Sequence, residues 1–285
     1  MARSSVSSTS SAKASAKTGR IRVGIGGWIY APWRGTFYPE GLAQRLELEY
    51  ASHHLGTLEI NSTYYGAQKP TSFQRWHDET PEDFVFSLKG PRFAMNRRVL
   101  AEAGASIERF LTGGLLNLGD KLGPINWQLM PGKQFDPEDY ARFLDLLPDE
   151  VDGHKLRHAL EVRHESFCAP EFVALARKRG AAIVVSGDSD YPQIADASAP
   201  FVYARIMGTA ANRKAGYGPA ELDRWVERAL TWAQGGTPDD LATFGKPLAA
   251  KAGRDVFLYV ISGHKAHNPA AAMALIERLS KRGAH

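Results

Sequence analysis

Cysteine is almost absent from this chain of 285 residues, because Cys168 is its only one. A single thiol excludes an intrachain disulfide and is typical of proteins in a reducing cytoplasm, where we expect this protein to be located. Long apolar runs are missing as well, whereas a helix needs roughly 20 consecutive apolar residues to cross a bilayer. We therefore expect a soluble protein with no membrane partner.

The chain also has little net charge outside its first 19 residues. The net charge is +4, but residues 1–19 contain Arg3, Lys13 and Lys17 and no acidic residue. Most of the basicity thus belongs to this segment, which argues against a nucleic-acid partner for the rest. The segment is rich in Ser, Ala and Lys and lacks apolar periodicity, which predicts a disordered tail that is not a secretory signal. We divide the chain into a tail, 1–19, and one domain, 20–285.

Eight short segments rich in apolar and β-branched residues alternate with helical patterns from Ile21 onward. The predicted strands are 21–26, 57–61, 84–89, 124–129, 158–163, 181–186, 201–206 and 255–261. Strands that alternate with helices favour a parallel sheet, and eight of them close into a TIM-barrel-like (β/α)8 domain of about 250 residues. The alternative is an open doubly wound sheet, which usually has fewer strands.

Helix starts are marked by prolines that suit a first turn. These starts are Asp136-Pro137, Pro170, Pro219 and Asn268-Pro269, with Asp136 and Asn268 as predicted N-caps. The interval 189–199 is short and contains Pro192, so we expect a turn there in place of a helix.

Polar residues recur on alternate positions at the C-terminal ends of the predicted strands. Successive strand residues point to opposite faces, and both faces of a parallel barrel are buried except near its C-terminal mouth. The pattern therefore predicts a polar, mixed-charge pocket inside that mouth, where barrel active sites are built. Taken strand by strand, the residues are Glu59 and Asn61, Ser87 and Lys89, Asn126 and Gln128, Glu161 and Arg163, Ser186 and Asp188, and Tyr203 and Arg205. The structural alternative is that the acidic and basic members form an ion network that only closes the barrel.

Several motifs in this order resemble the YecE-like family, also called domain of unknown function 72. They are GIGGWIYAPWRGTFYP at 24–39, EINSTYY at 59–65, FVFSLKGPRF at 84–93, LGPINWQL at 122–129 and ALEVRHESF at 159–167. The resemblance covers residues 21–282 and implies a TIM-barrel-like fold without an established reaction.

The pocket residues that the resemblance carries over to this chain lie in these motifs and in later strands. They are Trp28, Tyr30, Trp33, Glu59, Asn61, Tyr65, Lys89, Arg92, Gln128, Glu161, Arg163, His164, Asp188 and Arg205. The chain departs from the family at Ala94-Met95-Asn96, at Met207 and at Ser262-Gly263, which suggests a divergent member. Roles that depend on the family's polar residues at these positions are therefore not carried over.

The first functional hypothesis is an enzyme that performs acid–base chemistry on a small carboxylate or phosphate. Glu59, Lys89, Glu161 and Asp188 are the predicted catalytic residues, with a glutamate as base and Lys89 as acid or electrostatic stabiliser. Arginines suit planar anions, and aromatic rings can form the walls of such a pocket. The predicted substrate-binding residues are Trp28, Tyr30, Asn61, Tyr65, Arg92, Gln128, Arg163, His164 and Arg205. We predict neither a cofactor nor a metal, and no particular oligomeric state is indicated.

Two other hypotheses stay open. A non-catalytic or nucleic-acid-binding barrel would use the mouth aromatics and the three arginines of segment 92–98. A metal-dependent hydrolase or isomerase would use Glu59, Glu161, Asp188 and His164 as ligands. In addition, the Ser262-Gly263 turn and the Asn268 cap form a possible phosphate cradle.

Overall fold

The computed structural model describes residues 18–248 and 252–284. The predicted tail lies mainly outside these residues, but the backbone N–H of Gly19 donates to the Ala233 carbonyl at 2.9 Å. Within the described ranges, no helix has the length and apolarity that crossing a bilayer requires.

Eight parallel strands form a closed barrel, which confirms the predicted fold class. The strands are β1 (Ile21–Gly26), β2 (Thr57–Ile60), β3 (Val85–Lys89), β4 (Leu122–Gln128), β7 (His158–Glu161), β8 (Ala182–Gly187), β9 (Phe201–Ile206) and β10 (Asp255–Val260). Their order around the barrel is β1-β10-β9-β8-β7-β4-β3-β2, so each strand lies beside its neighbours in the chain. A two-stranded hairpin, β5 (Glu150–Val151) and β6 (His154–Lys155), lies outside the barrel.

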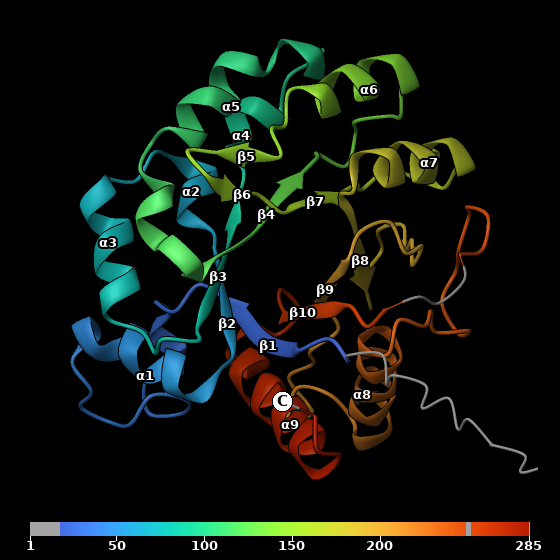
Figure 1. The fold of residues 1–285 in the computed structure, drawn as a ribbon. Coiled ribbons are helices and arrows are strands. Elements are labelled where there is room, and N and C mark those ends of the chain that lie inside the picture. The colour runs from blue at the N-terminus through green and yellow to red at the C-terminus, as the bar shows by residue number, and fades with distance from the viewer. Residues whose placement is uncertain (1–17, 249–251, 285) are drawn as a thin grey trace, which may run out of the picture.

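Helices surround the strands, with α8 and α9 on one side of the barrel and α5 and α6 on the opposite side (Figure 1). They are α1 (Glu47–His54), α2 (Ser62–Tyr65), α3 (Pro70–Asp78), α4 (Arg92–Met95), α5 (Gly104–Leu111), α6 (Pro137–Asp145), α7 (Pro170–Arg179), α8 (Pro219–Ala233) and α9 (Asn268–Lys281). Residues 188–200 connect β8 to β9 without a helix, as the sequence predicts.

The predicted helix caps have different outcomes. The Asp136 carboxylate accepts hydrogen bonds from the backbone N–H groups of Glu138 and Asp139, both at 3.1 Å, as an N-cap should. The prediction for Asn268 is wrong, because this residue is already helical. Its Oδ1 accepts a hydrogen bond from Thr209 Oγ1 at 2.8 Å, which ties α9 to the loop after β9. A free cap for a phosphate is therefore not present there.

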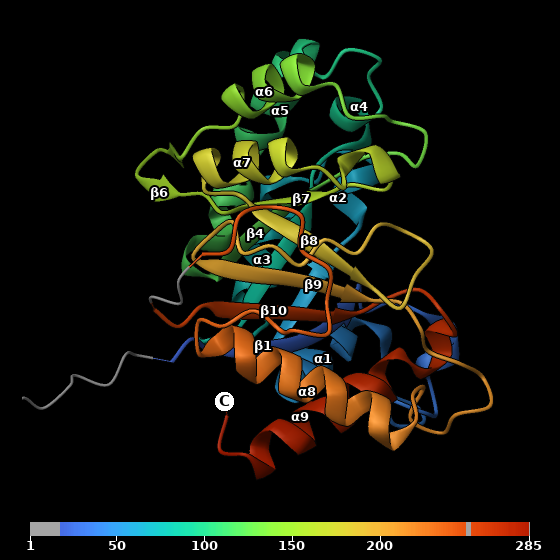
Figure 2. The ribbon, with the colours of Figure 1, turned by 90° about the vertical axis from the view of Figure 1, so that its right-hand side faces the viewer.

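Each face of the strands packs into its own apolar layer, one outside the barrel and one inside it. The larger layer packs strand residues such as Ile25, Leu58 and Trp127 against the helices. A smaller layer comprises Val85, Ala159, Ala182, Val184, Phe201, Tyr203, Phe257, Tyr259 and Ile261. These residues alternate with the outer set and fill the barrel interior, so the lumen is closed beneath the polar ends of the strands. The segments that follow β8 and β9 project at the same end of the barrel as α2 (Figure 2).

Candidate functional site

Arg205 on β9 lies at the centre of an ionic network inside the barrel. Its Nη1 donates to Glu161 Oε1 at 2.7 Å, and its Nη2 donates to Glu59 Oε1 at 3.1 Å. Both carboxylates are fully buried, and Arg205 is 3% exposed. The Tyr203 hydroxyl, two residues earlier on β9, donates to the other oxygen of Glu59 at 2.6 Å. Period-two alternation on β2, β7 and β9 thus brings these groups together, as predicted.

Amide side chains extend the network from Glu161 to Lys89. Asn126 Nδ2 and Gln128 Nε2 donate to the two Glu161 oxygens at 2.8 and 2.7 Å. Lys89 Nζ donates to Gln128 Oε1 at 2.7 Å, so the amide bridges the amine and the carboxylate. This arrangement follows from strand register, because Gln128 pairs with Glu161 across β4 and β7, and Asn126 pairs with Lys89 across β3 and β4.

Arg163 connects this network to the surface. Its Nε and Nη2 donate to Glu161 Oε1 at 3.1 and 2.8 Å, and its side chain is 18% exposed. The guanidinium carbon lies 4.4 Å from the centre of the Tyr191 ring. A cleft of about 400 Å³ adjoins these groups and is lined by Arg163, His164, Glu165, Cys168, Asp190, Tyr191 and Pro192.

The network shifts its acid and base strengths in opposite directions. Burial alone would raise the pKa of Glu161, but the charges of Arg205, Arg163 and Lys89 outweigh it and lower that pKa to about 2. Burial, aided by repulsion from Arg205, lowers the pKa of Lys89 to about 8. Glu161 is therefore a permanent anion at neutral pH, whereas Lys89 can exchange its proton near physiological pH.

The lumen holds more positive than negative charge. Lys89, Arg163 and Arg205 face only Glu59 and Glu161 within the network. Two of its fully buried polar atoms, Asn126 Oδ1 and Ser186 Oγ, have no hydrogen-bond partner among residues 18–248 and 252–284. Buried polar groups are normally paired. The Asn126 carbonyl can accept a further hydrogen bond, and the Ser186 hydroxyl can donate or accept one.

Asp188 does not lie with the other predicted catalytic residues. The predicted period-two pattern fails one residue past β8, where Asp188 has a left-handed backbone with φ of 52°. Its carboxylate is instead hydrogen bonded by Trp225 Nε1 of α8 at 2.7 Å. The absence of a side chain on Gly187 permits this contact, because a Cβ there would lie 2.3 Å from the Trp225 ring. Asp188 thus fastens α8 to the end of β8.

The aromatic residues predicted to line the pocket lie in different places. Trp28 packs edge-on against Trp76 of α3, with ring centres 5.4 Å apart, on the outer face of the sheet. Tyr30 packs against Trp33 and lies under the Lys265 amine, on the rim beyond the lumen. Neither residue reaches the Glu161 network in this structure.

The remaining predicted binding residues lie along the mouth. Asn61 is half-buried above Glu59 and donates to its carbonyl at 3.4 Å, while Tyr65 is 65% exposed. Arg92 is exposed, and its guanidinium carbon lies 5.2 Å from the centre of the Phe93 ring. His164 uses Nδ1 to contact Ser166 and faces the cleft.

Three residues near the site were not among the predicted catalytic or substrate-binding residues. Tyr64 of α2 lies beneath the Lys89 amine, which is 4.5 Å from the ring centre. Tyr203 was predicted with Arg205 to face the pocket, because both lie on the same face of the strand, but it was given no catalytic or binding role. Tyr191 comes from the irregular segment after β8, where the sequence has no periodicity to indicate its direction.

The metal-ligand set of the third hypothesis is not assembled. Asp188 is turned toward α8. His164 faces the surface cleft and does not point toward Glu59. Across the described part of the chain, no three His, Cys, Asp or Glu side chains are grouped so that they could hold a metal ion.

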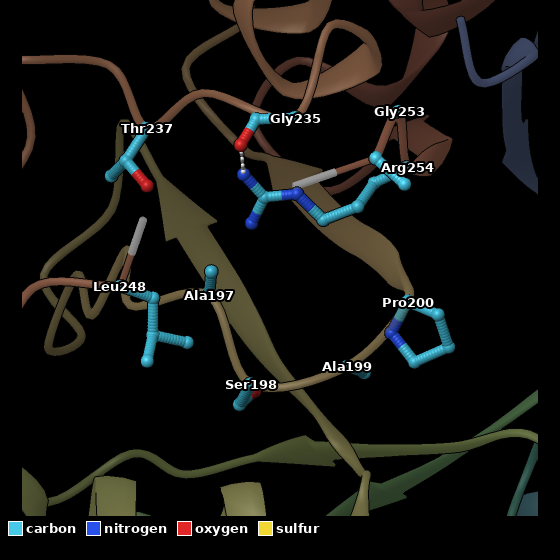
Figure 3. Close-up of a pocket in the computed structure, with 10 residues that line it drawn as sticks. Ala197, Ser198, Ala199, Pro200, Gly235, Thr237, Leu248, Gly253 and Arg254 are labelled. Atoms are coloured by element: carbon cyan, nitrogen blue, oxygen red, sulfur yellow. Dashed lines mark hydrogen bonds between the residues drawn. The ribbon is translucent and has the colours of Figure 1, made fainter. Parts of the chain in front are cut away.

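Another pocket, of about 360 Å³, lies at the opposite end of the barrel. It is formed by segments that precede β9 and β10, and Figure 3 shows the Arg254 guanidinium beside the Gly235 carbonyl. That hydrogen bond is 2.6 Å long, so the Arg254 guanidinium of this pocket already donates to a carbonyl of the protein. Because barrel chemistry is built at the C-terminal ends of the strands, this pocket is not our candidate site.

The fold and the network define the class of protein: a TIM-barrel-like α/β protein with a buried ionic network at the C-terminal ends of its strands. The chain belongs to the family described as "Protein of unknown function DUF72", whose model matches residues 22–285.

Similar proteins agree with this assignment. The chain is 29% identical over 152 residues to the UPF0759 protein YecE of Escherichia coli K12, which covers 52% of this chain and 50% of YecE. It is 24% identical over 191 residues to the UPF0759 protein YunF of Bacillus subtilis, which covers 64% of each. The match thus spans about half the length of YecE. A crystal structure of a DUF72 family protein from Thermotoga maritima superposes with a TM-score of 0.69 at 19% identity and covers 92% of this chain and 99% of that one. This likeness shows the shared fold.

Proposed function

We propose that the protein is an enzyme that transfers a proton to or from a small carboxylate or phosphate compound at the barrel mouth, with the Lys89 amine as the acid–base group. The observation that supports this proposal most is Lys89 itself. Lys89 is 7% exposed, and its amine donates to Gln128 and has a pKa lowered to about 8. An acid–base group is most effective when its pKa lies near the working pH.

The two glutamates have a different role from the one that the sequence suggests. With a pKa of about 2, Glu161 is too weak a base to accept a proton from most substrates. Its four charged or amide donors support a different role, in which Glu161 holds Asn126, Gln128, Arg163 and Arg205 in place around Lys89. In this proposal Glu161 is a positioning residue and Lys89 the base.

The excess positive charge of the network favours an anionic substrate. Arg163 faces both Glu161 and the cleft, so a carboxylate or phosphate that enters the cleft meets its guanidinium first. Guanidinium groups bind such planar or tetrahedral anions through paired N–H donors. In the proposed step, the neutral Lys89 amine removes a proton from carbon, and the C–H electron pair moves into the adjacent carbonyl or carboxylate. The ammonium that forms then returns a proton.

Deuterium incorporation tests this proposal across many candidate substrates at once. The protein is incubated in D₂O with a defined pool of small phosphorylated and carboxylate metabolites, and mass spectrometry detects carbon-bound deuterium. We expect incorporation by the wild-type protein into at least one compound, with loss of 100-fold or more in Lys89→Met. The matched control is Lys265→Met, because Lys265 also lies over a tyrosine ring, 4.3 Å from Tyr30, but outside the network.

The proposal also specifies a pH dependence. Since Lys89 acts as a base when neutral, the rate should rise through a pKa near 8. Absence of incorporation across the pool, or equal incorporation by Lys89→Met and the wild-type protein, would overturn the proposal.

A further inference from the structure

Large apolar side chains are exposed mainly along one half of the barrel mouth. Of the six that are exposed in the described ranges, five follow β1, β2, β3 or β4, which are adjacent in the barrel. These five, the mouth arc, are Ile29 (57%), Tyr65 (65%), Phe93 (64%), Val99 (38%) and Met130 (42%). Gathered exposed apolar side chains on a folded domain often mark an interaction surface.

Positive charge accompanies the mouth arc. Arg92, Arg97 and Arg98 lie between Phe93 and Val99 or beside them, and no acidic residue occurs in the chain between Asp83 and Glu102. None of the three arginines belongs to an ion pair within residues 18–248 and 252–284. Arg97 makes only a 3.3 Å hydrogen bond to Ser106 Oγ. Three guanidinium groups without carboxylate partners leave a local positive field that an anionic partner would neutralise.

The two most exposed side chains of the arc are aromatic and lie near the lumen. Tyr65 packs edge-on against Tyr64 with ring centres 5.2 Å apart, and Tyr64 lies 4.5 Å from the Lys89 amine. Thr63 Oγ1 donates to the Lys89 carbonyl at 2.7 Å, which fixes α2 against the end of β3. Phe93, on α4, follows that same strand end and carries the Arg92 guanidinium on its ring. The rings are therefore held by the barrel and are not on a long loop.

We propose that the mouth arc binds a single strand of nucleic acid, whose bases stack on Tyr65 and Phe93 and whose phosphates contact Arg92, Arg97 and Arg98. Exposed aromatic rings beside unpaired cations are the combination that single-stranded nucleic acids require, because every base has a flat face and every linkage a negative charge. This proposal departs from the expectation based on net charge, since a net charge averages over the surface, whereas three arginines gather at one edge.

Two other occupants fit the arc less well. A second copy of the chain that packed segment 92–99 against its own copy would bring arginines against arginines, because that segment contains no acidic residue. An acidic protein segment would match the charge but would leave the two rings without flat partners. It differs from nucleic acid in a measurable way, because polyglutamate offers charges without bases.

Fluorescence anisotropy of a labelled 15-nucleotide oligo-dT, titrated with the full chain, tests the proposal. We expect saturable binding at 50 mM salt that weakens about tenfold at 200 mM, as release of a few counterions requires. Tyr65→Ala and Phe93→Ala should each weaken binding about tenfold, and the combined Arg92→Gln, Arg97→Gln and Arg98→Gln variant should weaken it at least as much. Tyr65, Phe93, Arg92 and Arg98 are exposed and Arg97 is half-buried, so the variants should fold, which circular dichroism verifies.

Charge-matched controls separate the arc from the basic N-terminal segment and the lumen. A variant with Arg3→Gln, Lys13→Gln and Lys17→Gln removes equal charge outside the arc and should bind normally. Lys89→Met should also bind normally, so that failure of the proposed enzymatic role and failure of this proposal are distinguishable. No binding, loss of binding in the N-terminal variant alone, or polyglutamate competition that is as strong as that of unlabelled oligo-dT would overturn the proposal.

Discussion

Lys89 is the residue whose environment departs most from that of an ordinary surface lysine. An ammonium that is removed from water loses hydration, and Arg205 repels it, while Glu59 and Glu161 compensate only in part. The charged form of the Lys89 amine is therefore less stable in the folded protein than in water. Such a cost is often found at functional sites, although structural ion networks produce it too. Measurements of the free energy of unfolding show how much the buried charge of Lys89 lowers the stability of the protein.

The first prediction concerns the pH dependence of folding. The pKa of Lys89 lies near 8 in the folded chain and near its ordinary 10.5 in the unfolded chain, so the unfolded state binds the extra proton between these values. The wild-type protein should therefore gain stability over Lys89→Met as pH rises from 8 to 10, by roughly 1–3 kcal/mol. Urea unfolding at pH 7, 8, 9 and 10 measures the difference. Lys69→Met, which alters an exposed lysine, is the control, and parallel profiles for Lys89→Met and the wild type would contradict the prediction.

A second prediction at this scale concerns Glu161, which balances the buried arginines. Glu161→Gln keeps the shape of the side chain but leaves Arg205 and Arg163 short of negative charge, so we expect a loss of about 3–5 kcal/mol in unfolding free energy. Adding Arg163→Gln should recover part of that loss, because it removes one uncompensated charge. Glu138→Gln breaks an exposed pair with Arg142 and should cost less than about 1 kcal/mol. Equal losses for Glu161→Gln and Glu138→Gln in urea unfolding would show that the network bears little energy.

At the scale of elements, the end of each strand decides whether sequence alternation remains valid. Glu59, Lys89, Glu161 and Arg205 all lie within or at the last residue of a strand, and alternation placed each of them correctly inside the barrel. Asp188 lies one residue beyond β8, where the backbone turns into the left-handed region and the side chain leaves the lumen. The contact with Trp225 that replaces the lumen position links residues 37 apart in the chain, and no local pattern encodes it.

This difference yields a prediction about α8. Asp188→Ala should lower the unfolding free energy by about 1–3 kcal/mol, because it leaves the buried Trp225 N–H without its acceptor. Trp225→Phe removes that donor, so the double variant should lose less than the sum of the single variants in a double-mutant cycle. Deuterium incorporation by Asp188→Ala should match that of the wild-type protein. A specific loss of incorporation with unchanged stability would instead place Asp188 in the chemistry.

At the scale of the whole molecule, the barrel could be predicted because eight repeated strand–helix units agree with one another. The boundaries of β1 and β9 coincide with their predictions, and the others differ by at most a few residues at either end. The same period-two alternation predicted the residues of the site that lie inside the barrel. It did not predict the positions of the rim residues Trp28 and Tyr30. These follow β1 in an irregular segment, and their side-chain positions depend on distant partners such as Trp76 and Lys265. Sequence pattern thus predicts the interior of such a barrel better than its loops.

The acid limit of stability tests how the whole barrel depends on one buried neutral group. His158, at the start of β7, accepts a hydrogen bond from Trp127 Nε1 at 3.0 Å on Nδ1, and its Nε2 contacts the Pro148 carbonyl at 2.7 Å. A proton on Nδ1 would face the indole N–H, and burial lowers the pKa of His158 to about 4 from an ordinary 6.5. The unfolded chain therefore binds more protons between these values, and stability should fall by roughly 2–3 kcal/mol as pH drops from 6.5 to 4.

His158→Gln should remove most of this loss while keeping the steeper fall below pH 4.5, where the carboxylate of Glu161, with its lowered pKa, becomes protonated only in the unfolded chain. Urea unfolding of both proteins at pH 7, 6, 5 and 4 separates the two contributions. His53→Gln, at an exposed position on α1, serves as the control and should leave the profile unchanged. If His158→Gln loses as much stability as the wild-type protein between pH 6.5 and 4, the acid sensitivity of the barrel arises elsewhere, and the neutral His158 pairing is not what limits it.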